Sequence, residues 1–313
     1  MEEHSFAYEK KDSGFCILRV YGRSGRVVIP ERIEGIPVTE VSAYAFAREK
    51  DEEPEHDSGF PCICGTELEE LYLPKTIRSL GRYIFYNCLN FSRLSFYSNL
   101  AYMGAGAFTG CGNLSHLELH QVEGGSCLRE ILQDLKQKVT VDCYLELEIP
   151  AGMEKRWRLI YPEFFEEAVE NTPARIISTQ THGMGIQYRN AFRNTQVVFE
   201  EYDRLFETGK HHIDLPDLAE MVLARLQFPY ELGEGTKEYT SWLSENLRAG
   251  AEFCVLRNDV EAMRWLAEVF VSEDRQMELL LDTAKRREAP ELVSLLMDVK
   301  HRRFPGKKKK FSL

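Results

Sequence analysis

Hydrophobic positions in the first part of the chain recur every 23 residues. The seven matched positions are Leu71 and Leu94, Leu73 and Phe96, Ile77 and Leu100, Leu80 and Met103, Gly81 and Gly104, Phe85 and Phe108, and Cys88 and Cys111. Chance seldom preserves size, polarity and spacing over so many positions. A fixed period of this length predicts one supersecondary unit that is repeated along the chain.

An earlier copy of the unit contains an insertion. Val38, Val41 and Phe46 precede Ile77, Leu80 and Phe85 by 39 residues, which is the 23-residue period plus 16. The extra residues lie within 47–67, a charged stretch that also holds proline and glycine. We expect them to form an exposed loop on one rim. A partial fourth copy begins at Leu117.

The composition of the unit indicates how copies pack. Alternating leucines place both side chains on one side of a strand. The glycine permits a backbone turn that a side chain would obstruct, and the phenylalanine that follows wedges between neighbouring coils. Because one coil cannot bury its apolar face alone, copies stack into a continuous core. Residues 6–21 are expected to cap the N-terminal end.

Residues 27–46 resemble the opening of BspA-type leucine-rich repeats, and the Phe85-x-x-Cys88 and Phe108-x-x-Cys111 motifs resemble its later coils. The resemblance covers roughly residues 6–120. It departs from the family pattern in the insertion after Phe46, in Ser42 at a position where glycine is usual, and in the small number of copies. The resemblance implies a bacterial origin and protein–protein recognition, without an enzymatic activity or a defined partner.

The spacing of hydrophobic residues changes in the second half of the chain. Residues 139–149 alternate as a strand that ends or flanks the repeats, and Pro150–Gly152 marks a boundary. Further on, a short helix is predicted over 161–169, while 171–196 has no clear period. Helices are then expected at 214–226, 239–257, 260–270, 274–287 and 290–303. In this region Asn258 and Glu261 resemble a capping box.

These patterns predict an α+β protein with two domains. The first, residues 1–149, is a leucine-rich-repeat solenoid with a short-strand sheet and caps. The second, residues 150–313, is mainly helical, with a basic tail at 302–313. Four residue pairs 30 apart in its last part are similar to a degenerate ankyrin-like pair, namely Cys254 and Ala284, Glu261 and Glu291, Trp265 and Leu295, and Leu266 and Leu296. A plain helical bundle is the alternative.

Charge and composition limit the classes of partner and the compartment that we expect for this protein. The formal net charge of -11 disfavours general binding to nucleic acid. Neither a secretion signal at Met1–Ser5 nor a membrane-spanning run is visible, so a cytoplasmic location is expected. The eight cysteines are expected to be free thiols there. Lys307–Lys310 form a basic run that is expected to be a solvated end.

The residue pattern favours no catalytic or metal site and no cofactor. Only one residue separates Cys62 from Cys64, whereas zinc sites prefer about two to four. Cys88 and Cys111 occupy equivalent repeat positions, as expected of a packing column. His116 and His120 share one face of a predicted strand and are expected to be a surface pair. The sequence contains neither a Gly-x-Ser-x-Gly motif nor a Walker loop.

The remaining candidate for a functional site is the outward surface of the predicted repeat strands. Residues between the inward leucines should point outward in two columns, Arg26, Glu70, Arg93 and His116, then Val28, Tyr72, Ser95 and Glu118. Because Tyr and Arg are favoured at binding hot spots, these columns are the candidate partner-binding surface. The alternative is that they only solvate the sheet.

Three functions are compatible with the sequence. The first is a protein–protein interaction or scaffold module of a bacterial cytoplasm. The second is an enzyme of unknown class with its site in the helical half, around 179–193, where His182, Tyr188 and Arg189 are the candidate polar groups. The third is a regulator in which the repeat acts as a sensor.

Overall fold

The computed structural model describes residues 4–49, 52–56, 59–122, 124–146, 155–171 and 176–305. The chain divides into two compact units, unit 1 (Met1–His212) and unit 2 (Ile213–Leu313). Unit 1 therefore extends past the predicted domain boundary at residue 149. The boundary signal at residues 150–152 lies outside the described residues.

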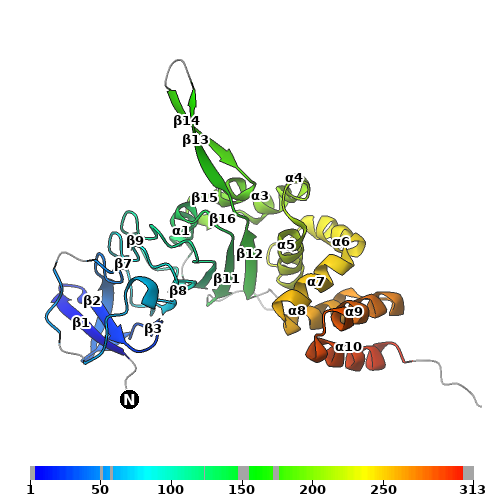
Figure 1. The fold of residues 1–313 in the computed structure, drawn as a ribbon, viewed down its shortest axis with the longest axis horizontal. Coiled ribbons are helices and arrows are strands. Elements are labelled where there is room, and N and C mark those ends of the chain that lie inside the picture. Colours follow the sequence, from blue (N-terminus) through cyan, green and yellow to red (C-terminus); the bar gives the residue numbers. More distant parts are fainter. Residues whose placement is uncertain are drawn as a thin grey trace, which may run out of the picture. The chain divides into compact units, whose positions relative to one another are not determined.

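Two sheets form the coils of unit 1 (Figure 1). Sheet 1 contains, in spatial order, β1 (His4–Lys11), β2 (Gly14–Gly22), β5 (Ile36–Val41), β7 (Ser79–Leu80) and β9 (Tyr102–Met103), with β4 (Arg32–Ile33) paired to β5. Sheet 2 contains β3 (Arg26–Val28), β6 (Glu70–Tyr72), β8 (Arg93–Tyr97), β10 (His116–Gln121), β11 (Val139–Leu145) and β12 (Arg156–Tyr161). Neighbouring strands from β3 to β11 run parallel, and β12 pairs antiparallel with β11. This is the predicted solenoid, in which the strand expected at 139–149 supplies the last parallel strand.

The phenylalanine wedges stack as the 23-residue period predicts. Ring centroids are 5.7 Å apart for Phe46 and Phe85 and 5.3 Å apart for Phe85 and Phe108, with the rings nearly parallel. Phe91 contacts the middle ring at 4.8 Å. All four side chains are buried. One coil therefore supplies the ring that covers the next, and the hydrophobic core is continuous along the repeats.

The repeated glycines are required by the spacing of the coils. A Cβ atom on Gly104 would lie 2.2 Å from the Arg82 nitrogen, and one on Gly81 would lie 2.1 Å from the Ala43 nitrogen. Neither glycine has the positive φ that a tight turn would demand. The turn expected from the sequence is therefore not the reason for these glycines. Successive backbones approach so closely that a side chain would collide with the coil before it.

Replacing Gly104 by alanine should destabilise unit 1 by about 2–3 kcal/mol, because backbone atoms on both sides must move apart. Gly112 in the same coil is the matched control, since a Cβ there meets nothing within 4 Å. Urea unfolding followed by circular dichroism measures both variants. Equal losses from G104A and G112A would show that coil spacing does not select the glycine.

The insertion after Phe46 is exposed along much of its described length, as expected, and is also anchored to the coils. The buried Arg19 guanidinium donates to the carbonyl oxygens of Tyr44 (3.1 Å), Ala45 (3.2 Å) and Ala47 and forms an ion pair with Glu53. His56 stacks on Tyr21 with centroids 4.9 Å apart. The 3-10 turn η1 (Gly65–Glu67) follows, where the Gly65 nitrogen donates to the Phe46 carbonyl at 2.8 Å. The insertion thus contacts β2 through Glu53 and His56.

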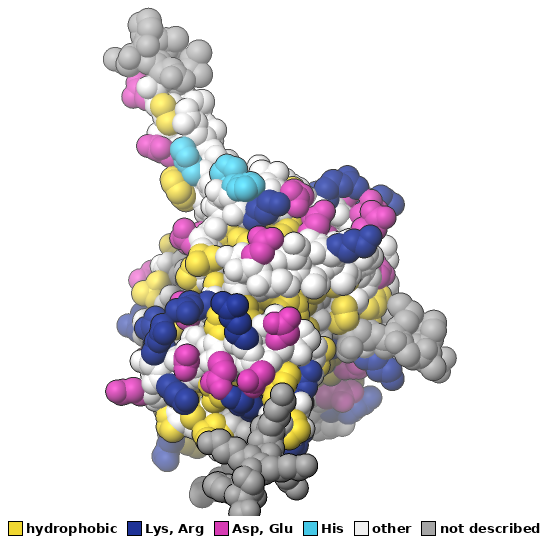
Figure 2. Space-filling view, turned by 90° about the vertical axis from the view of Figure 1, so that its right-hand side faces the viewer, with side chains coloured by type: hydrophobic (Ala, Val, Ile, Leu, Met, Phe, Trp, Pro, Cys, Tyr) yellow, Lys and Arg dark blue, Asp and Glu magenta, His cyan; other side chains and the backbone are white. Residues whose placement is uncertain are grey.

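The rest of unit 1 corrects one predicted element. Residues 161–169 are not a helix, because β13 (Phe165–Asn171) pairs antiparallel with β14 (Ile176–His182). This hairpin projects from unit 1 (Figure 1), and its surface carries hydrophobic and acidic side chains (Figure 2). The remaining elements are α1 (Leu128–Asp134), α2 (Gly185–Arg189), β15 (Phe192–Arg193), β16 (Gln196–Val197), α3 (Phe199–Arg204) and α4 (Phe206–Gly209).

Unit 2 is helical, as predicted, with two differences in detail. Its elements are α5 (Leu215–Gln227), α6 (Gly235–Glu245), α7 (Leu247–Arg257), α8 (Val260–Trp265), the π-helical turn η2 (Leu266–Phe270), α9 (Asp274–Arg286) and α10 (Pro290–Arg303). The helix predicted over 239–257 is interrupted at Asn246. The capping box at Asn258 is wrong, since Asn258 ends α7 with a φ of 50° and Asp259 caps α8 by accepting from the Ala262 nitrogen.

The 30-residue spacing falls on equivalent positions of two helix pairs, α7–α8 and α9–α10. Cys254 and Ala284 are both buried, as are Leu266 and Leu296. The ankyrin-like assignment itself stays a prediction. The basic run Lys307–Lys310 lies outside the described residues.

Candidate interaction surface

The outward residues of sheet 2 lie in columns across the strands. Pairing aligns Arg26, Glu70, Arg93 and His116 in one column, and Val28, Tyr72, Ser95 and Glu118 in the next, which Asp142 extends on β11. The register matches the expectation from the sequence at every one of these positions. Arg26 and Val28 are exposed, and most of the others are half-buried. Ser95 departs from the expectation, because it is only 4% exposed.

At the N-terminal end of the surface, Tyr72 contacts two charged side chains, Arg26 and Glu70. The Arg26 guanidinium lies over the Tyr72 ring at 4.9 Å from its centroid, and the Tyr72 hydroxyl donates to Glu70 at 2.6 Å. Arg26 also lies 3.5 Å from the Glu70 carboxylate. These contacts hold the tyrosine ring in place while the side chain stays partly exposed.

Glu118 contacts several polar side chains in the middle of the surface. Its carboxylate accepts from the Arg93 guanidinium at 3.4 Å and from the Ser95 hydroxyl at 3.2 Å, and its Oε1 lies 3.0 Å from His120 Nε2. Ser95 therefore holds the Glu118 carboxylate through this hydrogen bond, and the contact explains why Ser95 is buried. As a result, Ser95 positions the Glu118 carboxylate and is itself covered.

A third column of rings lies beside the two predicted ones. Tyr97, His120 and Tyr144 come from β8, β10 and β11, with ring centroids 4.8 Å and 5.6 Å apart. Arg156 extends the stack by placing its guanidinium 5.1 Å from the Tyr144 centroid. The repeat period already contained this signal, because Tyr97 and His120 are themselves 23 residues apart.

Asp142 is a buried carboxylate that organises the C-terminal end of the surface. Arg158 donates to it twice, at 2.8 Å and 2.9 Å, Arg156 donates at 3.0 Å, and His116 Nε2 lies 3.3 Å away. Burial alone would raise the pKa of Asp142, but the hydrogen bonds from His116 and Arg158 and the two arginine charges outweigh it. The pKa of Asp142 is therefore held well below its usual range, and the side chain stays ionised.

The substitution D142N should destabilise unit 1 by about 2–3 kcal/mol at pH 7, because two arginines lose a buried charged partner. A carboxyl whose folded pKa is depressed stabilises the fold above its unfolded pKa of about 4, and this contribution is lost as pH falls through the folded pKa. The gap between wild type and D142N should therefore be fully present at pH 7 and narrow progressively below about pH 4. Urea unfolding at a series of pH values measures it.

The matched control is E200Q, which removes an exposed i,i+4 pair with Arg204 and should cost less than about 0.5 kcal/mol. A gap for D142N that stayed constant from pH 7 to pH 3 would contradict the assigned ionisation.

The cysteines behave as packing residues, with one exception. All eight are free, and Cys88 and Cys111 are buried in successive coils as expected. Cys62 and Cys64 are half-buried on the insertion and so differ from the others. Within the described ranges, no group of three or more His, Cys, Asp or Glu side chains could hold a metal ion.

The three residues named for an enzymatic alternative have separate contacts. Tyr188 and Arg189 are fully buried, and Arg189 donates only to main-chain carbonyls, those of Leu132, Leu135, Gln137, Pro162 and Gly185. His182 lies on the hairpin and stacks on Phe165 at 4.7 Å. The structure therefore buries Tyr188 and Arg189 side by side on α2 and places His182 on the hairpin.

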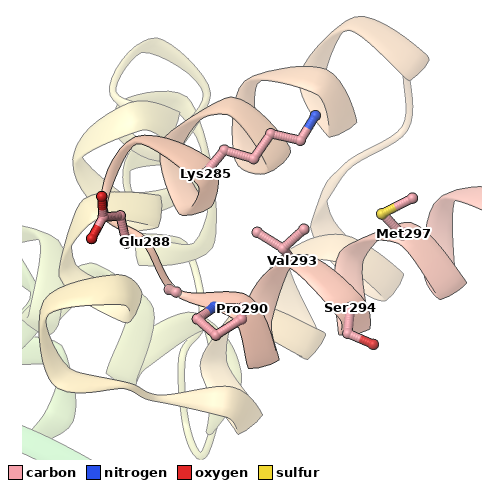
Figure 3. A pocket seen from close by; sticks show the side chains of 7 residues that line it. Lys285, Glu288, Pro290, Val293, Ser294 and Met297 are labelled. Atoms are coloured by element: carbon pink, nitrogen blue, oxygen red, sulfur yellow. The ribbon is translucent and has the colours of Figure 1, made fainter.

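Unit 2 has a cavity of about 740 Å³ at the turn between α9 and α10. Val293, Ser294 and Met297 of α10 and Lys285 of α9 line it (Figure 3). The Lys285 ammonium, the Glu288 carboxylate and the Ser294 hydroxyl point in different directions (Figure 3). Such an arrangement offers an apolar recess without polar groups directed at one point.

No helix in the part of the chain that the structure describes is both long enough and apolar enough to cross a membrane. Sequence comparison identifies residues 59–127 as a BspA type leucine rich repeat region, described by a family model of 6 copies. The matched segment begins in the insertion and ends just before α1. The expected repeat family is thereby confirmed for this part of the chain.

Two solved structures are similar to the chain. One is a leucine rich cell surface protein from Faecalibacterium prausnitzii A2-165, with 20% identity over 38% of this chain and 30% of that protein, and a TM-score of 0.24. The other is the leucine rich repeat protein of T. pallidum, with 22% identity over 42% of this chain and 77% of that protein, and a TM-score of 0.22. No curated protein matches the chain.

Proposed function

We propose that this protein is a non-enzymatic interaction module that binds another protein through the outward face of sheet 2. The observation that carries the proposal is the set of three aligned columns, in which half-exposed tyrosine, histidine and arginine side chains are fixed by their neighbours. Preordered side chains lose little conformational entropy on binding, and Tyr and Arg contribute most to binding hot spots.

The chemistry of this face indicates the kind of partner. Basic and acidic groups alternate along the first column, and the ion pairs Arg26–Glu70, Arg93–Glu118 and Arg158–Asp142 each join neighbours on this face. A face whose charges are already paired attracts neither a strongly acidic nor a strongly basic polymer by long-range steering. It suits a protein surface that offers hydrogen bonds and aromatic contacts.

A bacterial cytoplasm is part of the proposal. Eight free cysteines suit a reducing compartment, where disulfides seldom persist. Because sheet 2 presents an extended face, a scaffold that holds a partner through this face needs no cofactor of its own.

The test is selection of binders from a random peptide library displayed on phage, using the full chain as bait. The double variant Y72A/R93A should lose at least about tenfold in affinity for the selected peptides, because it removes one aromatic and one guanidinium contact. Its matched control is R82A/Y102A, which removes an exposed arginine and an exposed tyrosine away from sheet 2. Selected peptides that bind Y72A/R93A as tightly as wild type would count against this face.

A further inference from the structure

Cys62 and Cys64 lie beside a cavity of about 430 Å³ between the end of β2 and the insertion. Arg23 and Arg48 also line this cavity. It belongs entirely to unit 1 and lies apart from the columns of sheet 2. Because both thiols are half-buried, a small reagent can reach them.

The backbone places the two sulfur atoms on the same side. Cys62 bridges antiparallel to Tyr21, and the Ile63 nitrogen donates to the Val20 carbonyl at 2.9 Å. Cys64 is extended, with φ -149° and ψ 154°. In an extended segment alternate side chains share a face, so the buried Ile63 points inward while both cysteines face the cavity. Both residues line the same cavity.

The surroundings favour a thiolate at Cys64. The hydrogen bond from the Cys62 thiol lowers the pKa of Cys64 to about 7, burial opposes this effect, and the Arg19 and Arg48 charges add to it. The same hydrogen bond and burial raise the pKa of Cys62. For the other six cysteines, burial raises the pKa. Since the thiolate is the reactive form, Cys64 differs from the rest of the set.

We propose that Cys62 and Cys64 form a reversible redox switch, at which a hydroperoxide oxidises the two thiols to a disulfide. The Cys64 thiolate attacks the terminal peroxide oxygen, the O–O bond breaks, and the alcohol or water leaves after taking a proton. Cys64 is thereby oxidised to a sulfenic acid. Cys62 then loses its proton and attacks the Cys64 sulfur, the S–S bond forms and water leaves. In total, two thiols and one hydroperoxide give a disulfide, an alcohol or water, and water.

The geometry also makes this disulfide easy to reduce. Alternate Cα atoms of an extended strand lie roughly 6.6 Å apart, twice the rise of about 3.3 Å per residue. That separation is close to the upper end of the disulfide range, about 6.8 Å. A disulfide at the usual separation of about 5.5–6 Å would shorten this extended segment, and a strained disulfide is reopened readily by cellular thiols. Oxidation at this site is expected to be cyclic.

The experiment treats the full chain with hydrogen peroxide and maps the products by mass spectrometry. Trypsin cleavage at Lys50 and Lys75 gives a peptide whose only cysteines are Cys62 and Cys64. Wild type should lose two hydrogen atoms from this peptide and recover them with dithiothreitol. C62S should instead give a sulfenic acid at Cys64 that dimedone traps. C64S should react at least about tenfold more slowly at pH 7, since an ordinary thiol is only a few per cent ionised there.

A second readout does not depend on oxidation. The rate of iodoacetamide labelling at Cys64 should reach half its maximum near pH 7, and R48Q should move this midpoint to higher pH. R23Q is the matched control, because Arg23 lines the same cavity but lies over Phe60 and is not among the charges that act on Cys64. A wild-type peptide that stays reduced, or a labelling midpoint near 8.5 in wild type, would overturn the proposal.

Discussion

Replacing Phe85 by alanine is expected to lower the free energy of unfolding of unit 1 by about 3–5 kcal/mol, the range for deletion of a buried aromatic side chain. Phe85 is fully buried and contacts the rings of Phe46, Phe91 and Phe108. Its loss opens a cavity in the middle of the stack, where neither adjacent coil can move in without disturbing its own strands. For a unit of this size the melting temperature should fall by about 10 °C.

The control for F85A is L89A in the same coil, where the leucine side chain is 51% exposed. Its substitution should cost less than about 0.5 kcal/mol. Urea unfolding followed by tryptophan fluorescence and by circular dichroism compares the two variants. Similar losses from F85A and L89A would contradict a core made of stacked phenylalanines.

Replacing Arg189 by methionine is expected to cost about 3–5 kcal/mol, because it leaves five main-chain carbonyls without their donor. These acceptors lie in α1 and the segment after it, in the residue that follows β12, and in α2. One guanidinium therefore ties the end of the solenoid to the segment that follows the hairpin. Burial lowers the pKa of Arg189 to about 10, so the side chain remains charged at neutral pH.

R189K should lose most of the same stability, since a single ammonium group cannot reproduce the fork of donors. R193M is the matched control, because Arg193 is exposed on the neighbouring β15. Thermal and urea unfolding provide the measurement. If R189M unfolded like wild type, the structural role of Arg189 would be excluded and a role in chemistry would have to be reconsidered.

The repeat region was predictable because its spacing encodes its contacts. A period of 23 residues places Phe85 over Phe108 and Leu71 beside Leu94, and the structure shows both pairings. The period could not reveal why Gly81 and Gly104 are needed, since close approach of successive backbones depends on the rise between coils.

The hairpin was mispredicted for a physical reason. Phe164, Phe165, Ala168 and Val169 have helical spacing, yet Phe164 is buried while Phe165 is 60% exposed. The strand partner, β14, has no apolar period of its own, so pairing between the strands decides the structure and leaves no local signal. Buried arginines were missed in the same way, because most acceptors of Arg19 and Arg189 are main-chain carbonyls distant in the sequence, and Arg19 also pairs with the Glu53 carboxylate.

Part of the candidate surface could be predicted from the repeat period, and part could not. Extending the period by two residues along each strand would have added Tyr97 and His120. Asp142, Arg156 and Arg158 lie beyond the repeat, on β11 and β12, where no period relates them to the coils. Their cluster becomes visible only once the antiparallel pairing of these two strands is known.

The most direct test of the interaction surface is photo-crosslinking in the cells that carry the protein. A benzophenone amino acid is placed at position 72, on the outward face of sheet 2, or at position 102, on β9 of sheet 1. Position 72 is expected to give a discrete crosslinked product that excess wild-type chain suppresses and excess Y72A/R93A does not. Crosslinking at position 102 with equal yield, or a product at position 72 that Y72A/R93A suppresses as well, would contradict the assignment of sheet 2 as the binding face.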